Sequence, residues 1–213
     1  EKLAQLGSSR LDPGRPFVMR IEEQGDWFVH PGDQVVIGNS MRGRADLPVL
    51  AAIASRHAII RRERDEAAED VVYYIEAGRD RHGERKELQR NRRVLHGDVA
   101  ILEHGDVISL GGVLSFTFLK PVPGNATAVI RIAGDFTVHG CSRVILSAET
   151  GRTGSIIIGP GPMAHVPLAQ ERDQVEILRP DQGELQGTLL ARCRRGIAIE
   201  DGPERPQVKP QAA

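Results

Sequence analysis

The segment 34–39 reads Gln34-Val35-Val36-Ile37-Gly38-Asn39, a β-branched run that ends at a glycine. A polar turn then leads into Ala45-Asp46-Leu47-Pro48-Val49. The same arrangement recurs as Ser155-Ile156-Ile157-Ile158-Gly159-Pro160, which leads through a shorter turn into Ala164-His165-Val166-Pro167-Leu168. This internal repeat predicts two related β-domains in tandem. We expect function in the loop that follows each glycine, because the two copies differ there.

The bulk composition sets the class of protein. A chain of 213 residues with 40% hydrophobic residues can form one large packed domain or two small ones. The net charge of -1 is spread evenly along the chain, which argues against a nucleic-acid-binding face covering a whole domain. Two cysteines, Cys141 and Cys193, are too few for a disulfide framework, and we interpret them as free thiols of a reducing compartment.

Targeting signals are not apparent in the sequence. No apolar run approaches the ~20 residues that span a bilayer. The first residues also lack the apolar centre of a signal peptide. We therefore expect a cytoplasmic protein without a membrane segment.

Short apolar runs, separated by turn residues about every 8–12 positions, predict an all-β sandwich. The proline-rich residues 121–125 break both helix and strand, and we expect the domain boundary there. Residues 61–70 are all charged apart from two alanines, which predicts a solvated hairpin tip. The predicted organisation is a leader at 1–16, a first domain at 17–120, a linker at 121–125, a second, smaller related β-sandwich at 126–203 and a tail at 204–213.

Four segments of the first domain resemble, in order, the motifs of a forkhead-associated (FHA) domain. They are Val36-Ile37-Gly38, Ala45-Asp46-Leu47, Ser55-Arg56-His57-Ala58 and His104-Gly105-Asp106-Val107-Ile108-Ser109-Leu110-Gly111. The resemblance covers residues 17–120. It implies a two-sheet β-sandwich with recognition loops at one end, which binds phosphothreonine peptides in Ser/Thr-kinase signalling. It also implies structural roles for Gly38, His57, Gly105 and Asp106.

The candidate binding residues follow from the chemistry of phosphate and from this resemblance. A phosphothreonine carries about -1.5 to -2 charges and three strong acceptors, so it requires an arginine fork together with hydroxyl or amide donors. The sequence departs from the family at two points: Asn39 replaces the arginine after Gly38, and the serine lies at Ser55, one residue later than expected. Residues 79–93 carry seven basic against three acidic side chains. The candidate set is Asn39, Arg42, Arg44, Ser55, Arg56, Arg90 and Asn91.

Two interpretations follow. In the first, the arginines supply the positive field that Asn39 lacks, and the site binds a phosphorylated or acidic protein partner. In the second, the domain is a degenerate FHA domain that acts as a phospho-independent protein scaffold. Single-stranded nucleic acid is a third, weaker reading, because residues 79–93 contain no aromatic side chain on which a base could stack.

The second copy retains less of the pattern. Pro160 stands where the family has arginine, and His165 stands where the first copy has Asp46. The copy is also short, so we expect that it either lacks its last strands or is truncated, and that it leaves an unpaired sheet edge.

Catalytic and metal motifs are not found. The seven histidines form no His-x-His or His-Glu-x-x-His set, and the cysteines form no Cys-x-x-Cys pair. Neither a nucleophile elbow nor a phosphate-binding Gly-Lys-Ser/Thr loop is present. We therefore expect a non-catalytic protein without metal or other cofactor.

Overall fold

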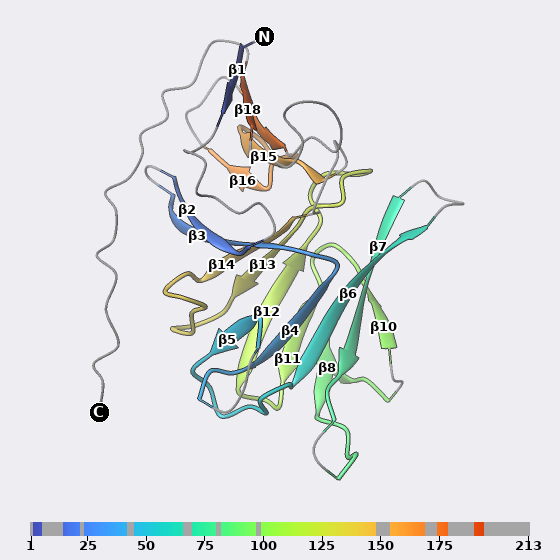
Figure 1. Ribbon diagram of the computed structural model, residues 1–213. Coiled ribbons are helices and arrows are strands. Elements are labelled where there is room, and N and C mark those ends of the chain that lie inside the picture. The colour runs from blue at the N-terminus through green and yellow to red at the C-terminus, as the bar shows by residue number, and fades with distance from the viewer. Residues whose placement is uncertain are drawn as a thin grey trace, which may run out of the picture.

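The computed structural model describes residues 2–5, 15–21, 24–41, 45–65, 70–79, 82–96, 99–147, 154–168, 174–178 and 190–193. Within these ranges the regular secondary structure is β-strand and no α-helix is found, which confirms the all-β fold (Figure 1). It follows that the described residues contain no helix of the length and apolarity that a membrane span requires.

An eight-stranded sheet, which we call the central sheet, runs through the molecule in the order β2-β3-β14-β13-β12-β11-β8-β9. Its neighbours pair antiparallel except β3 and β14, which run parallel. The strands are β2 Phe17–Ile21, β3 Gly25–Pro31, β8 Leu88–Arg90, β9 Arg93–Val94, β11 Val107–Leu110, β12 Leu114–Leu119, β13 Ala128–Ile132 and β14 Arg143–Ser147.

A five-stranded sheet, the first-repeat sheet, has the order β10-β7-β6-β4-β5. Apolar side chains from this sheet and from one face of the central sheet form the larger hydrophobic core, which includes Ile37, Ile60, Phe116 and Phe118. The strands are β4 Gln34–Asn39, β5 Leu47–Val49, β6 Ala58–Asp65, β7 Asp70–Ala77 and β10 Val99–Leu102.

A second five-stranded sheet, the second-repeat sheet, has the order β1-β18-β17-β15-β16. It packs on the opposite face of the central sheet through a smaller core that includes Trp27, Ile145, Ile158 and Ile177. The strands are β1 Lys2–Gln5, β15 Ile156–Gly159, β16 Val166–Pro167, β17 Val175–Leu178 and β18 Leu190–Cys193.

Strand β3 explains how the central sheet is shared. Successive side chains of a strand point to opposite faces. Phe28 therefore enters the larger core, while its neighbours Trp27 and Val29 enter the smaller one. An unbroken apolar run is typical of a strand that is covered on both faces. The molecule consequently has three layers, with the central sheet between the two repeat sheets (Figure 1).

The repeat seen in the sequence is also a repeat of strand pairing. Ile37 of β4 pairs with Leu47 of β5 in a parallel register, and Ile158 of β15 pairs with Val166 of β16 in the same way. In both copies the first of these strands then pairs antiparallel with the next, β6 or β17. An antiparallel hairpin precedes each copy, β2–β3 in the first and β13–β14 in the second.

The arrangement differs from two independent sandwiches in tandem. Residues 121–125 connect β12 to β13, which are neighbours in the central sheet and pair through Leu119 and Val129. The expected linker is therefore a connection within one sheet, because the hairpin of the second repeat extends the sheet of the first. The expected leader contains β1, which pairs with β18, so the described residues do not leave that edge unpaired.

The solvated hairpin tip predicted at residues 61–70 begins later than expected, because residues 61–65 belong to strand β6. Arg62 is buried, and its guanidinium donates to the Asp33 carboxylate, with Nε 3.1 Å from Oδ1. The same guanidinium lies 3.4 Å from the carbonyl oxygen of Ala126, which also accepts the Tyr73 hydroxyl at 2.5 Å. The buried bonds from Arg62 and Tyr73 to Ala126 fix the connection between the two repeats to the first-repeat sheet.

Candidate functional site

The loops that follow β4, β5 and β7 meet at one end of the first repeat, drawn at the bottom of Figure 1. Two glycines bring their backbones into close contact. A Cβ atom on Gly38 would lie 1.9 Å from the carbonyl oxygen of Ser55, and one on Gly78 would lie 1.8 Å from that of Arg56. No side chain fits into either space. These two contacts hold residues 54–57 between β4 and the end of β7. We call the end of the first repeat at which these loops meet the loop end.

His57 connects the same loops through its ring. The Ala54 N–H donates to Nδ1 at 3.3 Å, and Nε2 donates to the carbonyl oxygen of Glu87 at 2.8 Å. Burial lowers the pKa of His57. The neutral ring with its proton on Nε2 makes both hydrogen bonds, so His57 links the β5–β6 loop to the β7–β8 loop.

Asn39 is directed into the fold. Its Nδ2 donates to the carbonyl oxygen of Ala51, and its Oδ1 accepts the Met41 N–H at 2.7 Å. The Asn39 backbone N–H donates to Ala54 at 3.0 Å. This side chain therefore shapes the turn, and its polar atoms are already used by the protein.

Ser55 and Arg56 are the candidate residues that the loop end presents outward. Ser55 is half-buried and Arg56 is exposed. The adjoining β7–β8 segment adds Arg79, Arg85 and Lys86. The guanidinium of Arg79 donates to the Gly83 carbonyl at 3.1 Å, and that of Arg85 donates to the His96 carbonyl at 2.9 Å. These bonds order the two arginine side chains at the loop end.

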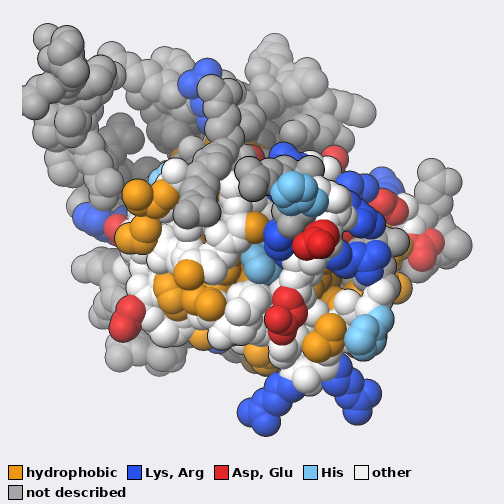
Figure 2. Space-filling view, turned by 90° about the horizontal axis from the view of Figure 1, so that it is seen from below, with side chains coloured by type: hydrophobic (Ala, Val, Ile, Leu, Met, Phe, Trp, Pro, Cys, Tyr) orange, Lys and Arg blue, Asp and Glu red, His pale blue; other side chains and the backbone are white. Residues whose placement is uncertain are grey.

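Figure 2 shows this end of the molecule. Lys and Arg side chains gather on one half of the face, interleaved with Asp, Glu and His, and hydrophobic side chains lie mainly on the other half. Two of the most exposed large hydrophobic residues belong to these loops, Met41 at 79% and Leu50 at 70%. The backbone N–H of Ser40 donates to the carbonyl oxygen of Val49 at 3.0 Å, and this bond joins the loop of Met41 to the loop of Leu50. The loop end thus offers an apolar area beside a basic one.

Arg90 and Asn91 do not join the loop end. Leu88 at the start of β8 pairs with Leu110 near the loop end, whereas Arg90 pairs with Ile108 toward the far end of β11. There the Arg90 Nε lies 2.7 Å from the buried carboxylate of Asp106, and the Asn91 Nδ2 donates to the same carboxylate at 2.7 Å.

Asp106 is the centre of this second cluster. Its carboxylate also accepts the Glu103 N–H at 2.7 Å. Burial opposes its ionisation, but the bonds from Glu103, Arg90 and Asn91 outweigh burial and lower its pKa. Gly105 precedes it with φ at +90°, a conformation that favours glycine. Arg90 and Asn91 therefore contribute to the fold of the β8–β9 and β10–β11 turns.

The remaining candidates, Arg42 and Arg44, lie outside the described residues. The sequence analysis overlooked Met41 and Leu50 as site residues. No clear sequence signal marks them, because Leu50 stands in an apolar, alanine-rich segment and single exposed apolar residues are common on protein surfaces.

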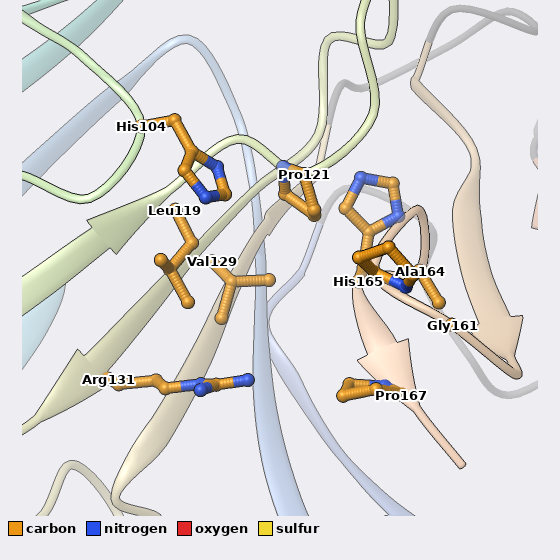
Figure 3. A pocket seen from close by; sticks show the side chains of 10 residues that line it. His104, Leu119, Pro121, Val129, Arg131, Gly161, Ala164, His165 and Pro167 are labelled. Carbon is orange, nitrogen blue, oxygen red and sulfur yellow. The ribbon is translucent and has the colours of Figure 1, made fainter. Parts of the chain in front are cut away.

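The second repeat has its own pocket beside the loop that follows Gly159 (Figure 3). It has a volume of about 190 Å³ and lies between the end of β12 and β13 on one wall and β16 on the other. His104 and Arg131 bring basic groups to it, and Leu119 and Val129 form an apolar part. His165 is buried against it, with both ring nitrogens bonded to backbone.

Comparisons with protein-family models, with curated proteins and with solved structures gave no match.

Proposed function

We propose that this protein is a non-catalytic interaction module whose loop end binds an acidic or threonine-phosphorylated segment of a protein partner. The observation that carries the proposal is the position of Arg56. Its backbone is fixed by the contact with Gly78, the residue that precedes the basic β7–β8 segment, and its side chain is exposed. Anion recognition requires cationic donors on a rigid support.

A neighbouring residue supports the same site. Ser55 contributes a hydroxyl next to Arg56, and its backbone is fixed by the contact with Gly38. Serine hydroxyls and arginine forks are the donors expected for a phosphate with three acceptor oxygens. Phosphopeptide binding in kinase signalling is the version of this proposal that the FHA resemblance favours.

A second candidate is a phospho-independent scaffold that contacts its partner through the apolar half of the loop end. Two observations favour it. Asn39 bonds to Ala51 and Met41 and is not available to a phosphate. Met41 and Leu50 are exposed beside it.

The test is a titration of the full chain with a library of phosphothreonine peptides, each paired with its unphosphorylated twin. The full chain is used because β13 and β14 complete the central sheet. We expect phosphate-dependent binding that weakens with salt, since exposed charges are screened. Arg56→Ala should reduce it at least about tenfold, in line with the loss of a charge-assisted hydrogen bond.

Arg64→Ala is the matched control. Arg64 is an exposed arginine of β6, six residues beyond Ala58 and so roughly 20 Å along the strand from the loop end. Equal loss in both variants would contradict a site at Arg56. Equal affinity for phosphorylated and unphosphorylated twins, reduced by Leu50→Ala, would instead support the scaffold.

A further inference from the structure

The two repeat sheets end in the same way, although the closing strands come from different parts of the chain. In the first repeat, β10 pairs antiparallel with β7 over four residues, from Val99 opposite Glu76 to Leu102 opposite Tyr73. In the second, β1 pairs antiparallel with β18 over four residues, from Lys2 opposite Cys193 to Gln5 opposite Leu190. Both closing strands occupy the fifth place of a sheet whose other four places match.

The origin of the closing strand differs between the repeats. In the first repeat, β10 follows β7, β8 and β9 along the chain. In the second repeat, the strand that pairs with β18 is β1, which precedes the first repeat along the chain. The N-terminal strand therefore belongs structurally to the C-terminal repeat.

Strand β18 is part of the second-repeat sheet and not a peripheral addition. Ala191 is buried, and it pairs with Ile177 of β17, a member of the smaller core. On its other side Ala191 pairs with Ala4. Removal of β1 would expose a row of backbone N–H and C=O groups along β18, and such an edge readily pairs with another strand.

We propose that the edge of β18 is a strand-acceptor site, and that Lys2–Gln5 of the same chain is an exchangeable donor strand that occupies it. The contact is made between main chains, so an extended segment supplied separately can take the same place. While β1 is bound, it prevents other strands from docking on this edge. The inference rests on sheet pairing and is independent of the function proposed for the loop end.

The register provides a test at single-residue resolution. Lys2 is directly opposite Cys193. Opposed residues of antiparallel strands have Cα atoms about 4.5–5.5 Å apart, within the range of roughly 4.4–6.8 Å that a disulfide bridges. Leu3 is opposite Arg192. A cysteine at position 2 should therefore react with Cys193, and a cysteine at position 3 should not.

The experiment starts from the full chain in which residues 9–11 are replaced by a protease recognition sequence. The protease then separates the donor strand from the rest of the chain after folding. The cut protein is incubated with a peptide of residues 1–7 carrying Lys2→Cys or, as the matched control, Leu3→Cys. The peptide is supplied as its mixed disulfide with glutathione, so that the Cys193 thiolate attacks the peptide sulfur and releases glutathione as the thiol. Mass spectrometry of digests then measures the mixed disulfide on Cys193. Cys141, which is 2% exposed, serves as the internal reference thiol.

We expect the Lys2→Cys peptide to label Cys193 at least about tenfold more than the Leu3→Cys peptide. We also expect the uncut chain to be labelled at least about tenfold less than the cut chain, because its own strand acts at a high effective concentration. Equal labelling by the two peptides, or equal labelling of cut and uncut chains, would overturn the proposal.

A second measurement addresses the source of the strand. Oxidation of the uncut Lys2→Cys variant should give a disulfide between positions 2 and 193 within the monomer. The same disulfide found solely in covalent dimers would show that the strand comes from another copy, and would overturn the assignment to the same chain.

Discussion

Asp46 and His165 make the same hydrogen bond in the two repeats. The Asp46 carboxylate accepts the Val36 N–H at 2.8 Å, and the His165 Nδ1 accepts the Ile157 N–H at 2.9 Å. Each acceptor immediately precedes the short strand that pairs with the donor's strand. A carboxylate in the first repeat and an imidazole in the second therefore fix the loop after the glycine through an equivalent hydrogen bond. A histidine loses this acceptor when its ring is protonated, and burial of His165 moves that protonation to lower pH by lowering its pKa.

The stability of the second repeat should depend on pH through His165. Burial lowers its pKa to about 4, while the unfolded chain titrates near about 6.5. The unfolded state therefore binds the proton first. The contribution to the free energy of unfolding is complete above about pH 6.5 and is lost as the pH falls toward 4, by about 3 kcal/mol in total.

Urea unfolding of the full chain between pH 7.5 and 4 measures this effect. His165→Asn is the informative comparison, because an amide oxygen can accept the Ile157 N–H but does not titrate in this range. We expect a flatter pH profile for the variant. Parallel profiles for the two proteins would show that His165 is not the responsible group.

Gly38 should tolerate no side chain. Its Cβ would meet the Ser55 backbone, which cannot rotate away as a flexible side chain could. We expect Gly38→Ala to lower the free energy of unfolding by about 3 kcal/mol, the upper range for overpacking. Gly83→Ala is the control, since its Cβ would meet nothing within 4 Å. With φ at +82°, that control should cost about 1 kcal/mol. Similar losses in both variants, measured by chemical denaturation, would contradict the close contact.

Much of the strand pattern could be predicted from the sequence. The runs around Gly38 and Gly159, and the correspondence of Asp46 with His165, followed from local residue order, because strand ends and turns are specified locally.

The sharing of the central sheet could not be predicted in this way. The run Trp27-Phe28-Val29 indicates burial on both faces, but it does not identify what covers the second face. Residues 121–125 break strands whether they separate domains or join two strands of one sheet. The pairing of β1 with β18 joins segments almost the whole chain apart, and four residues carry too little pattern to reveal it.

The composition of the candidate site was predictable in part. Ser55 and Arg56 lie at the loop end that the motifs indicated. Arg90 is close to the basic segment in sequence, yet strand direction carries it away toward Asp106. Charge alone does not distinguish a ligand-binding arginine from one that compensates a buried carboxylate.

Asn39 should matter for stability and not for binding. Asn39→Ala removes the bonds to Ala51 and Met41, and we expect a loss of about 1–2 kcal/mol in the free energy of unfolding. Ser40→Ala is the adjacent control, because the Ser40 bond to Val49 is made by its backbone and is retained. Affinity for the best-binding peptide should remain within a factor of about two at temperatures where the variant is folded. A large loss of affinity in the folded variant would instead assign Asn39 to the binding site.

Arg90 should likewise act on the fold through Asp106. Its removal leaves a carboxylate that is buried and has lost its charged partner, although the bonds from Glu103 and Asn91 remain. Breaking a buried ion pair typically costs about 3 kcal/mol or more. We expect Arg90→Ala to lower the free energy of unfolding by about that amount and to leave peptide affinity unchanged.

The control is Arg93→Ala. Arg93 is the cross-strand partner of Arg90, and its side chain is exposed. Denaturation and peptide titration of both variants separate the roles. If Arg90→Ala weakened binding while its stability matched that of Arg93→Ala, then Arg90 would belong to the binding surface after all.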